Sequence, residues 1–394
     1  MIQYDIPTIE FIKKQIQTDP NALLLAAKKY PDMDIPFVVD QITCRKQIKD
    51  KLPAWYANYD LYFPAKITTE QCSSEQTASY KQRLASGNIA CDMTGGLGID
   101  TYYISRNFEK FFYLERYEAY CDAARHNFNV LGASNIDVLN GDSIQLLTDL
   151  PSLDLIYVDP ARRSDCNKRL YDLSECEPNV VDLSPILLSK AKKLIVKVSP
   201  MADIHRCIEL IPQVKRIHVL SVRNECKELL LEVDSTEESK DVEIVCVNFP
   251  VTGEQSFSFF FNAEKSAPLN VVNTVHKYLY EPNASILKAG AFKSVATQFG
   301  IKKLHQHSHL YTSSELITDF PGRIFEVIEV DGFSKKWLQT ASKQIGQANL
   351  TTRNFPMTVA EIRKRSKLQE GGSLYLFATT LSDDQKVIVS CEKL

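Results

Sequence analysis

The chain has 394 residues, of which 44% are hydrophobic and 24% charged, and its formal net charge is -3. This length corresponds to two or three domains of about 150 residues each. The near-balanced charge excludes a wholly basic nucleic-acid-binding protein. No uncharged apolar stretch reaches the roughly 18 residues that a membrane span requires, so we predict no membrane partner.

The start of the chain and its cysteines indicate a cytoplasmic protein. Residues 1–17 lack the basic and apolar regions of a signal peptide. The ten cysteines are scattered, and no two form a Cys-x-x-Cys pair. This distribution favours reduced thiols over disulfides or a structural zinc site. We therefore expect cytoplasmic localisation and no bound metal, while the oligomeric state stays open.

Residues 1–85 are predicted to form a helical N-terminal region. The segments "TIEFIKKQI" and "PNALLLAAKKY" place apolar residues at helical spacing. In "CSSEQTASYKQRLAS", Ser73 and Gln76 have the spacing of a capping box. We therefore expect a helix that begins after Ser73.

Residues 86–235 alternate between short apolar runs and helical patterns. Seven runs are strand candidates, and helical patterns separate the first five: "NIACDM", "FFYLE", "NIDVLN", "LDLIYVD", "KLIVKVS", "IHVLSV" and "ELLLEV". Continuous apolar runs are typical of parallel strands that are buried on both faces. The pattern predicts an α/β domain of the Rossmann-like, doubly wound class, with a mostly parallel seven-stranded sheet.

The remainder of the chain shows a different pattern. "DSTEESKD", residues 234–241, is a short polar break and a candidate domain boundary. Beyond it, mixed strands and helices predict one or two small α+β modules. Residues 334–370 contain eight basic and two acidic residues. Such a cluster can bind phosphates, or it can be an ordinary solvated helix face.

A glycine-rich turn follows the first strand of the α/β domain. In "CDMTGGLGID", Gly95, Gly96 and Gly98 lack the Cβ atoms that would keep a ligand away from the backbone. Ligands of open parallel sheets bind at such strand ends. The spacing departs from the G-x-G-x-x-G fingerprint of dinucleotide enzymes, so the turn alone is equally consistent with a structural corner.

Acidic residues at successive strand ends favour a nucleotide site. Glu115 lies 23 residues after Asp92, close to the spacing of about 20 that is typical of a ribose-binding acid. Asp142, after the third strand, can accept the amino group of an adenine. Each acid alone is better explained as a loop carboxylate or a helix N-cap than as a ligand-binding residue. Three of them at neighbouring strand ends point to a bound nucleotide.

The fourth strand ends in "LIYVDPARR", residues 155–163. Asp159 is expected at the carboxyl end of the strand, and Pro160 stiffens the turn. A carboxylate at this position suits a substrate that donates N–H groups. Arg162 can stack on an unpaired base, bind a phosphate or form a structural salt bridge.

As a set, these motifs resemble class I S-adenosylmethionine-dependent methyltransferases over residues 70–235. The resemblance implies S-adenosylmethionine as cofactor. It also implies that Asp92, Thr94 and the glycines hold the methionine end, that Ser143 assists at the adenine, and that residues 73–81 close over the cofactor.

Residues 278–327 and 351–380 resemble a bacterial methyltransferase family with a C-terminal THUMP-like domain. That resemblance implies a ferredoxin-like module over 236–325, a THUMP-like domain over 326–394, and an RNA partner, tRNA or rRNA. The residues expected to bind RNA are Arg163, Arg363, Lys364 and Arg365.

The motif around Asp159 leaves the chemistry open. Amino-methylating enzymes carry an Asp, Asn or Ser followed by two prolines and an aromatic residue, and here Ala161 and Arg162 replace the last two. Enzymes that methylate carbon 5 of uridine need a cysteine on the next strand, where this chain has Ser199 and Pro200. We therefore favour transfer to a base nitrogen, with Asp159, Pro160 and Arg162 as catalytic residues. The alternatives are an RNA-binding protein that holds the cofactor without turnover, or a methyltransferase for proteins or small molecules.

Overall fold

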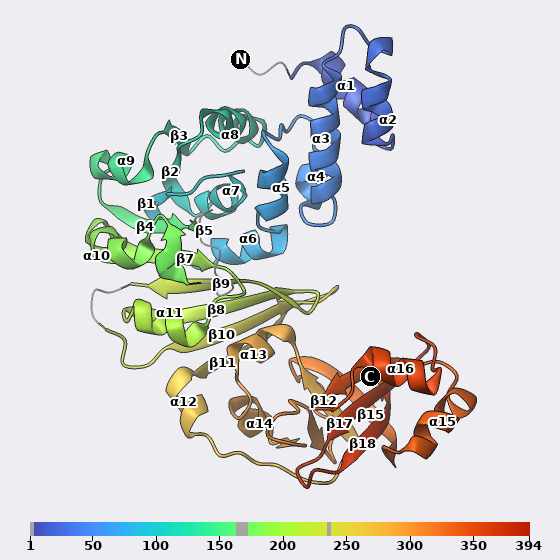
Figure 1. The fold of residues 1–394 in the computed structure, drawn as a ribbon. Helices are drawn as coiled ribbons and strands as arrows, with labels where there is room; N and C mark the ends of the chain where they lie inside the picture. The colour runs from blue at the N-terminus through green and yellow to red at the C-terminus, as the bar shows by residue number, and fades with distance from the viewer. Residues whose placement is uncertain (1–3, 163–171, 235–237) are drawn as a thin grey trace. The chain divides into compact units, whose positions relative to one another are not determined.

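The structure, a computed structural model, describes residues 4–162, 172–234 and 238–394 (Figure 1). The chain forms two compact units. One contains Met1–Val214 and Leu230–Glu238, and the other contains Lys215–Leu229 and Ser239–Leu394.

The N-terminal region is helical, as predicted. Its helices are α1 (Ile6–Gln15), α2 (Pro20–Leu25), η1 (Ala27–Lys29, a 3-10 helix), α3 (Ile35–Ile48), α4 (Pro53–Ala57), α5 (Lys66–Gln71) and α6 (Glu75–Gln82). The helices α1, α2 and α3 each begin with an aspartate N-cap and a proline in the first turn. Each carboxylate accepts an otherwise unpaired backbone N–H, which fixes the start of the helix. The predicted cap of α6 is wrong by one residue, because Ser74 accepts the N–H of Thr77.

A nine-stranded sheet follows, in the order β11-β10-β8-β9-β7-β4-β1-β2-β3. Its strands are β1 (Gly87–Asp92), β2 (Phe108–Glu115), β3 (Ile136–Asn140), β4 (Leu153–Val158), β7 (Ala191–Val198), β8 (Val214–Val222), β9 (Glu225–Val233), β10 (Glu243–Phe249) and β11 (Gln255–Phe260). The strands β3, β2, β1, β4 and β7 are parallel neighbours. The strand order reverses between β1 and β4, which is where ligands bind in open α/β sheets.

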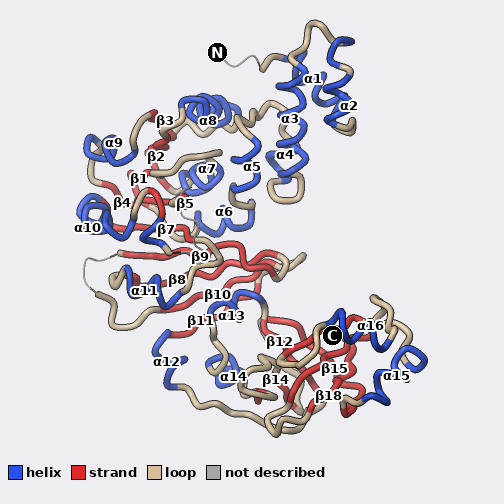
Figure 2. Tube along the Cα trace, viewed as in Figure 1, coloured by secondary structure: helices blue, strands red, loops and turns tan. Residues whose placement is uncertain are grey.

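This sheet confirms the predicted fold class, but it extends beyond the seven strands that the sequence indicated. All seven are present, and β10 pairs in parallel with β8 while β11 pairs with β10 in the antiparallel direction. An apolar run shows that a segment is a strand, but it does not show which sheet supplies its hydrogen bonds. Figure 2 shows the helices between the strands, namely α7 (Ile99–Ser105), α8 (Glu118–Val130), α9 (Ser143–Asp149), α10 (Val180–Lys190) and α11 (Ile204–Leu210).

A short ribbon follows β4. It consists of β5 (Ala161–Arg162) and β6 (Cys176–Glu177), with η2 (Leu173–Glu175) just before β6.

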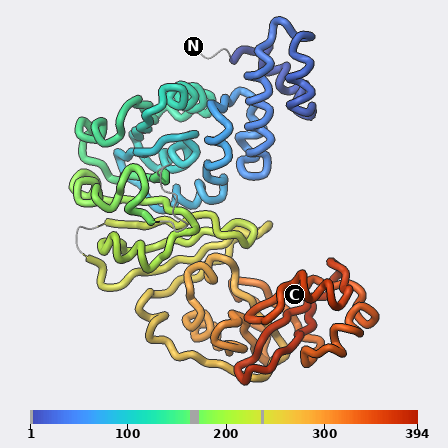
Figure 3. Tube along the Cα trace, viewed as in Figure 1, coloured from blue at the N-terminus to red at the C-terminus, as the bar shows by residue number. Residues whose placement is uncertain are grey.

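The C-terminal part contains a seven-stranded sheet in the order β13-β14-β12-β15-β18-β17-β16. Its strands run from orange to red in Figure 3, and they are β12 (Tyr278–Pro282), β13 (Lys302–Lys303), β14 (Tyr311–Ser313), β15 (Gly322–Gly332), β16 (Asn349–Arg353), β17 (Leu374–Thr380) and β18 (Lys386–Lys393). The accompanying helices are α12 (Phe261–Ser266), α13 (Ala284–Ala289), α14 (Ser294–Phe299), α15 (Lys335–Gln344) and α16 (Val359–Ser366). The predicted α+β character is confirmed, and pairing of β12 with β15 joins residues 278–393 in one sheet. Among the described residues, no helix is long and apolar enough to span a membrane.

Candidate functional site

The strand register brings the predicted acids to one edge of the sheet. Asp92, the last residue of β1, lies opposite Tyr113 of β2 and Tyr157 of β4. Glu115 ends β2, and Asp159 directly follows β4. Because these strands are parallel, their carboxyl ends meet at the same edge. The acids that are distant in sequence are therefore neighbours at the point where the strand order reverses.

Asp92 is a buried carboxylate, with 1% of its surface exposed. Its Oδ1 accepts hydrogen bonds from the backbone N–H of Thr94, at 2.9 Å, and from the Thr94 hydroxyl, at 3.2 Å. Its Oδ2 accepts from the hydroxyl of Thr101, at 2.7 Å. Burial nevertheless raises the pKa of Asp92 to about 7. A cationic group of a ligand would stabilise the ionised form of this side chain.

The glycine turn packs directly against Tyr113. A Cβ atom on Gly95 would lie 2.3 Å from the Tyr113 ring, so only glycine fits there without a shift of the ring. Gly96 and Gly98 have φ angles of +55° and +79°, which favour glycine. The Tyr113 hydroxyl donates to the carbonyl oxygen of Gly96 at 2.6 Å. The turn is thus held close to the carboxyl end of β1, and its Gly96 has room where a side chain would be.

Glu115 is tied to the same turn. Its Oε2 accepts the Gly96 N–H at 3.0 Å, and its Oε1 accepts the Tyr117 N–H at 2.9 Å. These bonds orient the carboxylate at the end of β2. Asp142 is the N-cap of α9 and accepts two backbone N–H groups through Oδ1, while Ser143 is the first residue of that helix. The N-cap reading of Asp142 is therefore confirmed, and any contact with a ligand would be an additional role.

Asp159 lies beside the turn and is linked to it. Its backbone N–H donates to the Thr94 hydroxyl at 2.7 Å, so Thr94 connects the surroundings of Asp92 with those of Asp159. The Asp159 side chain is 39% exposed. Pro160 is buried, and Arg162 is exposed in β5, opposite Cys176 of β6. Arg163 lies outside the described residues.

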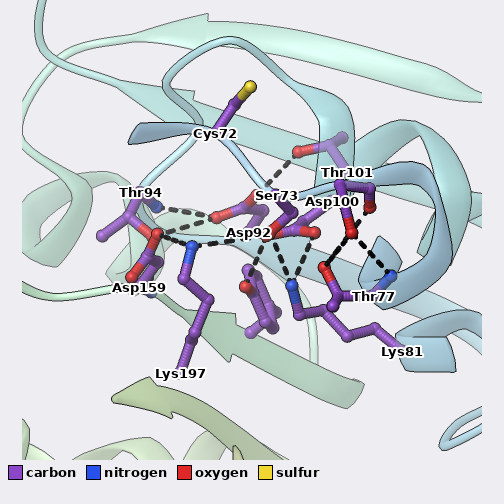
Figure 4. A network of polar contacts seen from close by, with 12 residues as sticks. Cys72, Ser73, Thr77, Lys81, Asp92, Thr94, Asp100, Thr101, Asp159 and Lys197 are labelled. Carbon is purple, nitrogen blue, oxygen red and sulfur yellow. Dashed lines mark hydrogen bonds and ion pairs between the residues drawn. The ribbon is translucent and has the colours of Figure 1, made fainter. Parts of the chain in front are cut away.

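The structure adds Lys197, which the sequence analysis missed. Val196 of β7 lies opposite Val158 of β4, so Lys197 and Asp159 are the next residues on two adjacent strands. The Nζ atom of Lys197 lies 2.5 Å from Oδ2 of Asp159 and 3.9 Å from Oδ2 of Asp100 (Figure 4). A lysine inside the apolar run "LIVKVS" was the available signal, because a charged residue there needs a partner.

A buried polar network continues from Asp100 into the N-terminal helices (Figure 4). Oδ1 of Asp100 lies 2.8 Å from Nζ of Lys81, which also donates to the Ser73 hydroxyl. Oδ2 of Asp100 accepts from Ser73 and from the Tyr157 hydroxyl, at 2.8 and 2.7 Å. Burial alone would raise the pKa of Asp100, but the ammonium groups of Lys81 and Lys197 bring it well below its usual value.

This network explains why residues 73–81 lie close to the glycine turn: Ser73 and Lys81 both contact a side chain of α7. The expectation that they also cover a bound ligand stays a prediction.

The basic residues of the C-terminal part differ in their surroundings. Arg363 donates to the carbonyl oxygens of Ala348 and Leu368, at 3.0 and 3.3 Å, and so fixes the end of α16. Lys364 and Arg365 are exposed. Exposed lysines also lie on α15, at positions 335, 336 and 343. Arg363 therefore has a structural role, whereas the other residues form an exposed basic surface, here defined as Lys335, Lys336, Lys343, Lys364 and Arg365.

Comparison with known proteins finds relatives of the two C-terminal domains and of nearly the whole chain. Residues 278–321 match a ferredoxin-like domain family, and residues 322–393 match a family described as THUMP domain-like. A crystal structure of a protein from Porphyromonas gingivalis W83, assigned as a methyltransferase, is 34% identical. The match covers 98% of this chain and 98% of that one, with a TM-score of 0.90.

The chain belongs to the bacterial family of class I S-adenosylmethionine-dependent methyltransferases with a C-terminal THUMP-like domain.

Two less similar structures match less than half of this chain. An rRNA methylase from Streptococcus thermophilus is 12% identical, with a TM-score of 0.33, over 41% of this chain and 96% of that one. Precorrin-6y C5,15-methyltransferase from Geobacter metallireducens GS-15 is 14% identical, with a TM-score of 0.32, over 43% and 92%. No curated protein matches the chain.

The site fits the methyl donor of this family. Gly96 has no side chain and is only partly buried, and the partly buried carboxylate of Glu115 at the end of β2 can accept hydrogen bonds from hydroxyl groups.

Proposed function

We propose that this methyltransferase modifies a base nitrogen in structured RNA, either tRNA or rRNA. The observation that carries the proposal is the position of Asp159. Its carboxylate is partly exposed at the edge of the sheet, and its backbone is hydrogen-bonded to Thr94 of the glycine turn. A nucleophile that binds to Asp159 would therefore lie next to the methyl donor.

For the donor, we propose that Asp92, Thr94 and the glycines Gly95, Gly96 and Gly98 hold the methionine end. Glu115 would accept hydrogen bonds from the ribose hydroxyls, because its carboxylate is already oriented by Gly96 and Tyr117. Asp142 and Ser143 would lie at the adenine. S-adenosylmethionine, when bound, supplies an electrophilic methyl group on a positively charged sulfur.

For the acceptor, Asp159 would accept a hydrogen bond from an N–H group of the base and orient the nitrogen lone pair toward the methyl group. The methyl group would pass from sulfur to nitrogen, S-adenosylhomocysteine would leave, and the displaced N–H proton would pass to solvent. This is catalysis by positioning, in which the enzyme aligns donor and acceptor. The buried Pro160 would hold the backbone of Asp159 in place. Arg162, which is exposed on the adjacent ribbon, would stack on the base or bind a neighbouring phosphate.

The surroundings of the site favour nitrogen over carbon as the acceptor. Methylation of an unactivated ring carbon requires a thiolate. Ser199 and Pro200 follow β7 where a thiol would be needed. Cys72 is labelled near the network in Figure 4, but burial raises its pKa and so disfavours the thiolate. Cys166 lies outside the described residues.

The proposal that the substrate is RNA rests on the C-terminal part of the chain. The exposed basic surface provides five cations on two adjacent helices of a THUMP-like domain. Cations on one surface can neutralise consecutive phosphates of an RNA backbone.

The test is incubation of the purified protein with tritium-labelled S-adenosylmethionine and total RNA from a strain that lacks the protein. We expect label in one RNA size class with the wild type. Asp159→Asn should reduce incorporation by at least about 100-fold, since it removes the oriented acceptor, while calorimetry shows nearly unchanged donor binding. If wild-type protein binds the donor but labels no RNA, the RNA proposal fails. Repetition with extracted proteins and metabolites would then identify the alternative substrate class.

A further inference from the structure

A lysine is held between two carboxylates at the edge where the reaction would occur. Lys197 lies 2.5 Å from Asp159 and 3.9 Å from Asp100, and its side chain is 13% exposed. It belongs to β7, where Val196 and Val198 on either side are buried. Placing an ammonium group in such surroundings costs free energy, and nearby carboxylates must offset it. The pairing with Asp159 is therefore specific.

We propose that Lys197 is a positioning residue for methyl transfer, holding Oδ2 of Asp159 so that Oδ1 faces the acceptor nitrogen. This inference rests on the proposed role of Asp159. Carboxylates rotate about their terminal bond in a broad energy well, so a free Asp159 would sample several orientations. An ammonium group at hydrogen-bonding distance selects one of them.

The anchor of Lys197 is itself fixed. Asp100 accepts hydrogen bonds from Lys81, Ser73 and Tyr157, all of which are buried. Asp100 belongs to α7, which follows the glycine turn, whereas Lys197 belongs to β7 and Asp159 follows β4. The chain of contacts from Asp100 through Lys197 to Asp159 thus couples the donor turn to the acceptor carboxylate (Figure 4).

The ion pair of Lys197 and Asp159 also determines the net charge close to the bound donor. S-adenosylmethionine and its product S-adenosylhomocysteine differ by one methyl group and by the positive charge on sulfur. In the wild type, Lys197 neutralises Asp159. Without Lys197, the carboxylate should attract the charged sulfur more strongly, so the donor should gain affinity relative to the product. A lysine that only stabilises the fold at a distance from the donor, such as Lys193, would change both affinities equally.

The experiment measures dissociation constants for S-adenosylmethionine and S-adenosylhomocysteine by calorimetry in the full-length protein. Lys197→Met should shift their ratio in favour of the donor by about three- to tenfold, the effect of one partly screened charge at close range. Asp159→Asn should shift the ratio in the opposite direction. The double variant should lie close to the wild type. Lys193→Met is the matched control, because Lys193 pairs with Glu232 at the other end of β7 and should leave the ratio unchanged.

Transfer to the extracted RNA gives the second measurement. Lys197→Met should lower the turnover rate by at least about tenfold with a smaller change in KM for RNA, since positioning acts on the aligned complex. Lys197→Arg should restore part of that rate. An unchanged ratio in Lys197→Met overturns the inference. Absence of label with the wild type overturns the RNA proposal instead, and the affinity ratio still decides the role of Lys197. If Lys197→Met does not fold, Lys197→Gln, which also removes the charge, takes its place, and an unchanged affinity ratio in Lys197→Gln overturns the inference.

Discussion

The pKa values of two carboxylates at this edge, Asp92 and Asp100, are shifted in opposite directions because their partners differ. Asp92 receives hydrogen bonds from hydroxyl and amide groups but lies beside other acids, and burial raises its pKa to about 7. Asp100 is equally enclosed but contacts two ammonium groups, which lower its pKa. The residue type alone therefore does not define the charge at a site; the neighbours do.

A pH-dependent stability follows for Asp92. As pH rises from about 4 to about 7, the unfolded chain loses the proton first while the folded protein retains it. The free energy of unfolding should therefore fall across that range and level off above it. Asp92→Asn should remove this decrease, making the variant more stable than the wild type at pH 8 relative to pH 5 by about 2–3 kcal/mol. Urea unfolding at both pH values measures it, and parallel curves for the two proteins would contradict it.

At the scale of elements, the turn between β1 and α7 depends on one close contact. Gly95 has room for a hydrogen atom only, since Tyr113 fills the adjacent space and is itself fully buried. The same tyrosine donates to Gly96. A change at Gly95 would consequently displace the turn and the Gly96 amide that orients Glu115.

Gly95→Ala should therefore weaken both folding and donor binding. Overpacking of a tight site costs about 1–3 kcal/mol of stability, and we expect at least a tenfold higher dissociation constant for S-adenosylmethionine. Thermal unfolding and calorimetry measure the two effects. The matched control is Gly332→Ala, where a Cβ atom meets nothing within 4 Å. Equal behaviour of the two variants would show that the Tyr113 contact is unimportant.

At the scale of the whole molecule, the surface proposed to bind RNA belongs to a different compact unit from the proposed site of methyl transfer. The glycine turn and Asp159 belong to the first unit, and α15 and α16 belong to the second. We therefore expect the exposed basic surface and the donor site to respond to mutation independently, because their residues belong to different compact units.

Charge reversal on α16 tests this separation. Lys364→Glu with Arg365→Glu should weaken RNA binding and reduce the slope of log K against log salt by up to about 0.7–0.9 per lost phosphate contact. The affinity for S-adenosylmethionine should stay the same. Lys28→Glu with Lys29→Glu, an equal charge change at exposed positions of η1, should leave RNA binding unaltered. Arg363 is left intact because it holds the end of α16. An unchanged salt slope in the α16 variant would exclude the basic surface as a docking site.

The sequence by itself determined which segments form strands and helices. It also determined which strands are followed by acidic residues. Parallel strands are local apolar runs, and their carboxyl ends share one edge, so Asp92, Glu115 and Asp159 could be assigned to a common site before any contact was known. The glycine turn was equally local. These features depend on residues within a few positions of each other, and local patterns are what a single sequence displays.

Only the tertiary structure decided which charged side chains meet. Lys81, Asp100 and Lys197 come from three separate segments of the sequence, and no pattern in those segments shows that their side chains meet. Strand pairing is likewise not visible in a single sequence: the pattern of β10 indicated a strand but did not show that it would pair with β8. The same limit applies to Arg363, which the basic run grouped with Lys364 although its guanidinium binds backbone carbonyls. Partner choice depends on packing across the fold, where burial makes an unpaired charge too costly and so selects the pairs that form.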